Sequence, residues 1–193
     1  MLVHTRQPQQ AGVTLIELVI GIAIIALLLT LSLPSMQLWM RDLQIRAGAE
    51  SILEGLQLAR QEAVRRNANV IFTLTSAGGL TDWTVTDLST APVTVIQSRS
   101  SAAGTPNARL IASTALLGAQ VYTNTPTAVA VLPAGATFNG TGRVNPGANL
   151  TRIDVTNVQS TAARRLVITI APGGQMRLCD PAFTIANSSQ GCV

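Results

Sequence analysis

The residue with the most unusual chemistry in this sequence is Glu17, a carboxylate near the start of a long apolar stretch. Residues 13–33 span 21 positions without Lys, Arg, Asp, Pro or aromatic residues. At about 1.5 Å per helical residue this stretch is ~31 Å long, which matches the hydrocarbon core of a bilayer. A carboxylate in such a segment costs roughly 2.5 kcal/mol or more, so it indicates a functional group with a specific partner.

Cleavage of the chain between Gly12 and Val13 would create that partner, a new α-amino group. Glu17 is the fifth residue counted from Val13, so an ion pair within one helix is conceivable. The more useful pair joins subunits: Glu17 of one helix meets the amine of a neighbouring helix and sets their axial register. Such a pair is far stronger in a low-dielectric environment than in water, and a missing partner is correspondingly costly.

Two simpler interpretations explain the apolar stretch less well. A secretory signal peptide has a shorter apolar region followed by a small-x-small cleavage site, whereas this stretch is long and ends in SLPSMQLW. A plain membrane anchor fits the length but gives no reason for Glu17.

The composition removes most classes of enzyme. All 13 basic residues are Arg, and His4 is the only histidine. If residues 1–12 are removed, a Ser-His-Asp or Cys-His site, a His-ligated metal and a Schiff-base lysine all become impossible. The remaining acids are scattered, and those between 42 and 62 follow a helical pattern typical of solvated charges. We therefore expect no enzyme, no metal and no cofactor, and the net charge of +4 permits an acidic partner without demanding one.

The rest of the chain predicts an α+β fold, a long N-terminal helix packed on a C-terminal antiparallel β-sheet domain. Residues 35–68 continue the helix with one apolar stripe, which Asn67 and Asn69 terminate. Short alternating segments then predict half-buried antiparallel strands, and APGG at 171–174 predicts a hairpin turn. The stripe is Ile45, Ala49, Ile52, Leu53, Leu56, Ala59 and Ala63, and the predicted strands are 69–75, 82–87, 93–98, 128–132, 150–156, 164–170 and 174–179, with loops at 99–109 and 123–128.

The motif GVTLIEL at 12–18, followed by an apolar run and Pro34, resembles the class III signal of type IV pilins and pseudopilins. The resemblance implies that a prepilin peptidase cuts after Gly12, that Val13 becomes N-methylated, and that Glu17 sets the register between subunits. It divides the chain into a leader (1–12), a transmembrane helix (13–34) that Pro34 kinks, an amphipathic helical half (35–68) and a β-rich domain (69–193). The family usually has Phe where Val13 stands, and often a more basic leader.

Three further stretches resemble the GspH/FimT group of minor pilins and pseudopilins: LQLARQEAVRRN, FNGTGRV and GGQMRLCDP. The resemblance implies a single-pass protein of the bacterial inner membrane with a periplasmic C-terminal domain, and filament subunits as partners. Three functions remain open: a FimT/FimU-like minor pilin of a type IV pilus, a GspH-type pseudopilin of a type II secretion system, and a minor pilin that binds DNA during uptake. The first is favoured over the second by the C-terminal RLCDP and the cysteines.

A periplasmic domain would also pair the two cysteines, because that compartment is oxidising. A Cys179–Cys192 disulfide would join the C-terminal tail to the last strand.

DNA-binding FimT members carry a Gly-Arg-x-Arg motif, which here reads Gly174, Gln175, Met176, Arg177 and so lacks its first arginine. Arg177 is kept, and Arg164 and Arg165 fall on the strand expected to pair with it. Three guanidiniums on one hairpin could follow phosphates. The alternative is that Arg165 pairs with Asp180 and the others are solvated charges at a sheet edge.

Overall fold

A computed structural model of the chain describes residues 12–119, 121–126, 129–159 and 163–192, without the side chains of residues 31–35 and 119. The chain forms two compact units, residues 1–39 and residues 40–193. Helix α1 (Leu15–Arg66) contributes to both. The predicted leader, residues 1–12, lies outside the described residues except for Gly12.

In the first unit, α1 starts directly after Thr14 and carries apolar side chains on every face. The large hydrophobic side chains described between Leu15 and Leu29 are all more than half exposed. A helix that is apolar all round needs a non-aqueous or protein environment to cover it. The backbone stays helical through Pro34, and the predicted kink at that residue remains a prediction.

Across the helical residues that the structure describes with side chains, no window is long and apolar enough to cross a membrane. The predicted span 13–34 includes residues 31–34, whose side chains lie outside that description.

In the second unit, the apolar stripe of α1 forms the centre of the core, as predicted. Six of its seven residues are 0 to 1 % exposed, and Leu53 is half-buried against them. Gly55 allows a close approach, since a Cβ there would come within 2.8 Å of the Phe72 ring and 3.1 Å of Trp83. The helix ends where Asn67 adopts a positive φ of 49°, with bonds from Asn67 N to Val64 O and from Ala68 N to Ala63 O. This is the Schellman arrangement, in which a left-handed residue closes the last turn.

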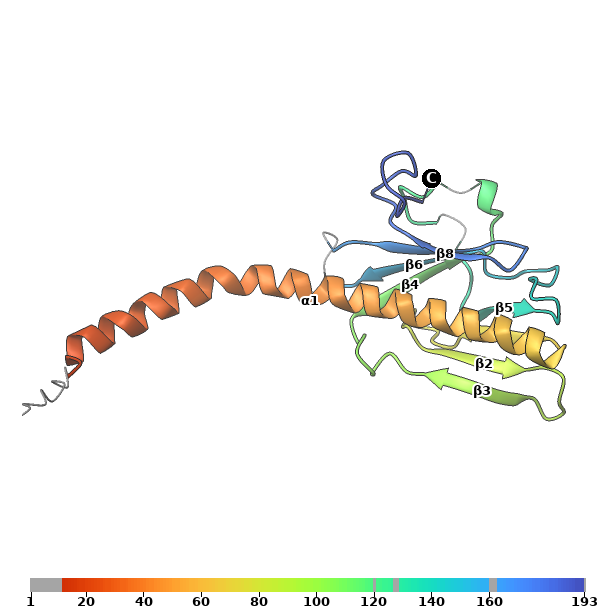
Figure 1. The fold of residues 1–193 in the computed structure, drawn as a ribbon, viewed down its shortest axis with the longest axis horizontal. Helices are drawn as coiled ribbons and strands as arrows, with labels where there is room; N and C mark the ends of the chain where they lie inside the picture. The colour runs from red at the N-terminus through yellow and green to blue at the C-terminus, as the bar shows by residue number, and fades with distance from the viewer. Residues whose placement is uncertain (1–11, 120, 127–128, 160–162, 193) are drawn as a thin grey trace, which may run out of the picture. The chain divides into compact units, whose positions relative to one another are not determined.

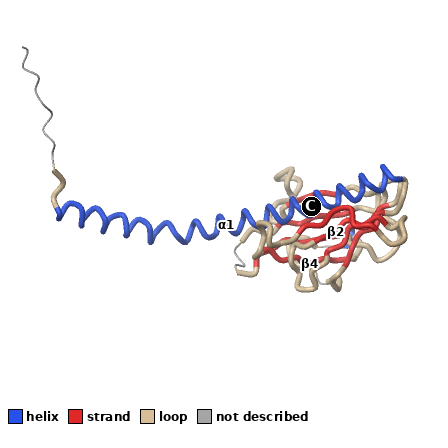
Figure 2. Tube along the Cα trace, turned by 90° about the horizontal axis from the view of Figure 1, so that it is seen from below, coloured by secondary structure: helices blue, strands red, loops and turns tan. Residues whose placement is uncertain are grey.

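The strands form two antiparallel sheets in the same unit as α1 residues 40–66 (Figure 1). Sheet A has the order β3-β2-β1-β5 and sheet B the order β4-β6-β7-β8. Figure 2 shows the strands gathered on one side of this half of α1. The strands are β1 (Val70–Leu74), β2 (Trp83–Asp87), β3 (Thr94–Arg99), β4 (Ala108–Ser113), β5 (Ala134–Phe138), β6 (Arg152–Asn157), β7 (Leu166–Ile170) and β8 (Met176–Cys179), with a short 3-10 helix η1 (Leu117–Ala119).

The predicted α+β class is confirmed, with two errors in the strands. The strand expected at 128–132 is wrong: residues 129–132 are not in a strand, residue 128 lies outside the described residues, and β5 follows at Ala134–Phe138. Strand β4 was missed, since its first residues fall in the stretch expected to be a loop. The hairpin turn between β7 and β8 is confirmed: Gly174 N donates to Ala171 O at 2.8 Å, and Gly174 has a φ of 78°.

Candidate functional site

The residues expected at the cleavage site precede α1 and are exposed. Gly12 and Val13 lie outside the helix, and a Cβ added at Gly12 would meet no atom within 4 Å. Thr14 caps the helix, because its Oγ1 accepts a hydrogen bond from Glu17 N at 3.3 Å and its carbonyl accepts one from Leu18 N at 3.2 Å. Glu17 thus occupies the acidic position of the Ser/Thr-x-x-Glu pattern of helix starts.

The carboxylate of Glu17 is exposed, and the described residues give it no ion-pair partner. At the first turn of a helix a negative charge is favoured by the peptide dipoles. That contribution alone is small, and it leaves the carboxylate free to bind a cation from outside this unit. The geometry is therefore compatible with the predicted pairing between subunits, which stays a prediction.

The arginines expected to contact DNA each bind groups of the same domain. Arg165 is engaged most deeply: Nη1 lies 2.7 Å from Asp154 Oδ2, and Nη2 donates to Tyr122 O at 2.5 Å and to Thr123 O at 2.9 Å. Its side chain is 15 % exposed. The expectation that Arg165 pairs with Asp180 is wrong, because Arg164 Nε makes that ion pair instead.

Arg164 and Arg177 hold the C-terminal segment against the sheet. Arg164 binds Asp180, and its guanidinium lies 5.7 Å from the centre of the Phe183 ring. Arg177 Nη2 donates to Ser189 O at 3.1 Å and to Gly191 O at 2.7 Å. These contacts give both side chains a structural role, and the predicted DNA contact by Arg164, Arg165 and Arg177 remains untested.

The disulfide expected between Cys179 and Cys192 is present, with a Cα–Cα distance of 5.0 Å. It anchors the same C-terminal segment. We expect Cys192→Ser to lower the free energy of unfolding by about 3 kcal/mol, because the crosslink closes a loop of about 14 residues in the unfolded chain. Chemical denaturation would measure this loss, with Ser188→Ala as a control in the same segment. Two thiols that react with an alkylating reagent in the unreduced native protein would contradict the prediction.

Sequence reasoning missed a buried ion cluster on the outer face of sheet B. Arg152 and Asp154 are 1 % and 0 % exposed, and Arg152 Nε lies 2.6 Å from Asp154 Oδ1. Arg152 also donates to Val121 O at 3.0 Å and to Asn124 O at 2.7 Å, and its guanidinium lies 4.9 Å from the Tyr122 ring centre. Burial raises the pKa of the Tyr122 hydroxyl. Together with Arg165, these contacts fix the loop 121–124 to the sheet.

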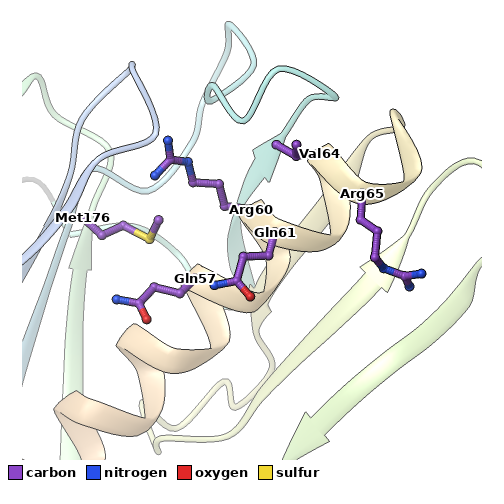
Figure 3. A pocket seen from close by; sticks show the side chains of 6 residues that line it. All are labelled: Gln57, Arg60, Gln61, Val64, Arg65 and Met176. Carbon is purple, nitrogen blue, oxygen red and sulfur yellow. The ribbon is translucent and has the colours of Figure 1, made fainter.

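A groove lies along the C-terminal part of α1, beside β8. Its volume is about 530 Å³, and its lining contains two amides, two guanidiniums and no acidic group: Gln57, Arg60, Gln61, Val64, Arg65 and Met176. In Figure 3 the side chains of Gln57 and Met176 reach toward one another across this groove. Arg60 Nε donates to Gly142 O at 3.1 Å, so the loop after β5 fixes the position of this guanidinium.

The stretches FNGTGRV and GGQMRLCDP, which both follow the helix in the sequence, meet beside this groove. Val144 N donates to Pro172 O at 3.1 Å, which joins the segment FNGTGRV to the turn at 171–174, where the stretch GGQMRLCDP begins. A Cβ added at Gly174 would lie 1.9 Å from Gly142 O, so the contact requires glycine there. Arg60 lies on the helix at the same junction, within the stretch LQLARQEAVRRN, but the sequence did not identify it as a groove residue.

Arg65 belongs to the groove lining but its charge is already paired. Its Nη2 lies 2.6 Å from Glu62 Oε2, and Arg66 Nε lies 2.8 Å from the same oxygen. Hydrogen bonds from Arg65 and Arg66 lower the pKa of the Glu62 carboxyl.

Arg66 also binds Asp87 at 3.0 Å. Hydrogen bonds from Ser89 to the Asp87 carboxylate lower its pKa, and the contact with Arg66 lowers it further. Glu62 is thus paired with both Arg65 and Arg66, and Arg46 is paired with Glu50.

Among the residues that the structure describes, no group of three or more His, Cys, Asp or Glu side chains could hold a metal ion.

Comparison with known proteins places these features in a family. Residues 48–174, or 127 of the 193 residues, match the family described as type II transport protein GspH, and residues 7–33 match the prokaryotic N-terminal methylation motif. Comparison with curated proteins gives no match. The fold is similar to that of the minor pseudopilin EpsH from the type 2 secretion system of Vibrio cholerae, with 13 % identity and a TM-score of 0.51, over 72 % of this chain and 99 % of that one. The chain belongs to the GspH family of type IV pilin-like proteins.

Proposed function

We propose that this protein is a minor subunit of a type IV filament, a FimT/FimU-like minor pilin that a prepilin peptidase cleaves after Gly12 and methylates on Val13. The N-terminal methylation motif at residues 7–33 includes both residues and Glu17. The segment from Val13 onward would anchor the protein in the inner membrane and then pack among other subunits. Residues 40–193 would form its periplasmic domain.

The observation that carries this proposal is an exposed carboxylate in the first part of α1, where the large hydrophobic side chains from Leu15 to Leu29 are also exposed. In the isolated chain neither Glu17 nor the apolar side chains around it are covered. A bundle of such helices covers the apolar surface and supplies an N-terminal amine to each carboxylate. Neither a soluble domain nor a simple anchor uses both features.

A second candidate is a GspH-type pseudopilin of a type II secretion system. The family match and the likeness to EpsH favour it. Both candidates use the same N-terminal chemistry, so they differ in the partner subunits rather than in the physics of assembly. Genes for pilus minor subunits or for a secretion system beside this gene would separate them.

Replacing Glu17 by alanine tests the shared proposal. We expect the variant to enter the membrane and to keep a folded domain, but to be at least about tenfold less abundant in purified filaments. The reason is that an amine left without its carboxylate in a low-dielectric bundle costs roughly 3 kcal/mol or more, well above the 1.4 kcal/mol of a tenfold change. Quantitative immunoblotting of sheared filaments against membranes gives the ratio.

The matched control is Glu54→Ala, which removes an exposed carboxylate from the other half of the same helix; Glu54 makes only a 3.9 Å contact with Arg99. This variant is expected to assemble like the wild type. Assembly of Glu17→Ala at wild-type levels would remove the register role of Glu17. Performing the assay with pilus subunits and, separately, with secretion-system subunits tests which of the two filaments incorporates the protein.

A further inference from the structure

Sheets A and B have four edge strands, β3, β4, β5 and β8. An unpaired edge exposes backbone N–H and C=O groups that can bind another strand. Loops of the same chain already cover two of them, β4 and β5. The covering bonds run from Leu110 N to Gly79 O and from Ala130 N to Ala112 O at β4, and from Asn145 N to Thr137 O and from Leu150 N to Gly135 O at β5.

The outer edge of β8 is open over part of its length. Ile170 N donates to Thr151 O, so this residue faces away from β8. Because bonding alternates along an antiparallel pair, Arg177 and Cys179 are the β8 residues bonded to β7. Met176 and Leu178 therefore direct their N–H and C=O groups outward, where the described residues offer them no backbone partner.

The far end of the same edge already accepts a strand from this chain. Asp180 N donates to Gln190 O at 2.7 Å, and Asp180 forms a parallel bridge with Gly191. The outer edge of β8 therefore already accepts a strand at its C-terminal end. The outward backbone groups of Met176 and Leu178, nearer its N-terminal end, remain open.

The groove beside α1 lies next to this open part of β8, since Met176 belongs to both. Arg60 supplies its unbalanced charge. The described residues give a partner to its Nε but none to its two terminal nitrogens, whereas the charge of Arg65 is neutralised by Glu62. Gln57 and Gln61 add amides that can donate and accept hydrogen bonds.

The other uncovered edge, β3, lacks this setting. Its residues are exposed or half exposed, and its pairing with β2 shifts register between Val85 and Thr86. Irregular pairing of this kind is one way in which proteins discourage strand addition. A groove beside β3 does contain the guanidinium of Arg99, but this group faces the carboxylate of Glu54 at 3.9 Å, and Asp82 adds a negative charge to the same lining.

We propose that the outer edge of β8 binds an extended acidic segment of another protein, which adds to sheet B as a fifth strand. The backbone of the segment bonds to Met176 and Leu178, and one of its carboxylates binds the terminal nitrogens of Arg60. Main-chain bonds supply affinity and the side-chain contacts supply specificity, as in other strand additions. The inference holds for a pilus and for a secretion pseudopilus alike, and does not depend on either.

The test uses the full chain in detergent micelles and five fluorescent heptapeptides with blocked ends. Each peptide alternates threonine and valine and carries one glutamate, placed at the second to the sixth position in turn. We expect at least one to bind saturably in an anisotropy titration at low salt, and about tenfold more weakly when glutamine replaces its glutamate, because hydrogen bonds to charged groups exceed neutral ones. Hydrogen exchange at residues 175–179 should slow when this peptide is bound.

Two variants separate the backbone and charge contacts. Met176→Pro removes an outward N–H without removing a bond to β7, as proline does at an edge strand. It should weaken binding of the glutamate peptide and of its glutamine counterpart about tenfold each. Arg60→Gln should weaken binding of the glutamate peptide about tenfold but change the glutamine peptide little, which a loss of structure would not do. The control is Arg109→Gln, an arginine on β4 at the opposite edge of sheet B.

Three results would overturn the proposal. The first is that none of the five peptides binds. The second is that Met176→Pro, shown by circular dichroism to be folded, and Arg60→Gln both bind the peptide like the wild type. The third is that a 20-base-pair DNA duplex, or a second copy of this chain detected by light scattering, occupies the site and displaces the peptide while depending on Arg60.

Discussion

Replacing Asp154 by asparagine is expected to lower the free energy of unfolding of the domain by about 3 to 5 kcal/mol, the usual cost of removing one partner from a buried ion pair. Asp154 is fully buried and lies within 2.7 Å of both Arg152 and Arg165. Asparagine removes the negative charge that lies against the guanidiniums of Arg152 and Arg165 beneath the loop 121–124. The size of the effect comes from the loss of this buried counter-ion.

Chemical denaturation followed by circular dichroism of the sheets would measure the change. The control Glu50→Gln removes one member of an exposed ion pair, in which the side chains of Arg46 and Glu50 are 61 % and 56 % exposed. Pairs of this kind contribute about 0 to 1 kcal/mol, so the control should be close to the wild type. Hydrogen exchange at residues 121–124 should also quicken in Asp154→Asn. A loss below about 1 kcal/mol would contradict the prediction, because it would show that the charge of Asp154 contributes little to stability.

The helix and its buried stripe could be predicted because their signals are local. Apolar residues repeat every three or four positions from Ile45 to Ala63, and Asn67 ends the pattern with a residue that tolerates a positive φ. The acidic residue Glu17 was recognisable for the same reason, since its contrast with its neighbours is visible in seven consecutive residues. These features need no knowledge of what folds against them.

Strand β5 was misplaced because its sequence is a poor strand by propensity. The segment AGATF contains Ala and Gly, which are depleted in strands, and the apolar residues before it matched the pattern better. The structure shows why glycine is needed: a Cβ at Gly135 would lie 2.4 Å from Phe72 O. Pairing with β1 therefore outweighed local preference.

The ion cluster and the β8 groove were not predictable, because their members come together only through the sheet pairing. Register places Asp154 beside Val167, and nothing in the spacing of Arg152, Asp154 and Arg165 identifies Tyr122 as the residue that covers them. Arg165 illustrates the difficulty. Among the acids near in sequence, Asp180 seemed the natural partner, yet the folded chain gives Asp180 to Arg164 and Asp154 to Arg165.

Replacing Gly12 by leucine is expected to abolish maturation, so that the chain stays full length when produced with a prepilin peptidase. Gly12 is exposed and has no side chain, and a peptidase that must approach the backbone closely on both sides of the cut cannot accept a branched group there. The control is Gly21→Leu, a change at an equally open position within the apolar helix, which should mature normally. Intact-mass spectrometry distinguishes the two products, since maturation removes residues 1–12 and adds a methyl group to Val13. Normal maturation of Gly12→Leu, or cleavage after residue 33, would show that this segment is not a pilin leader, and would remove the amine that Glu17 is proposed to bind.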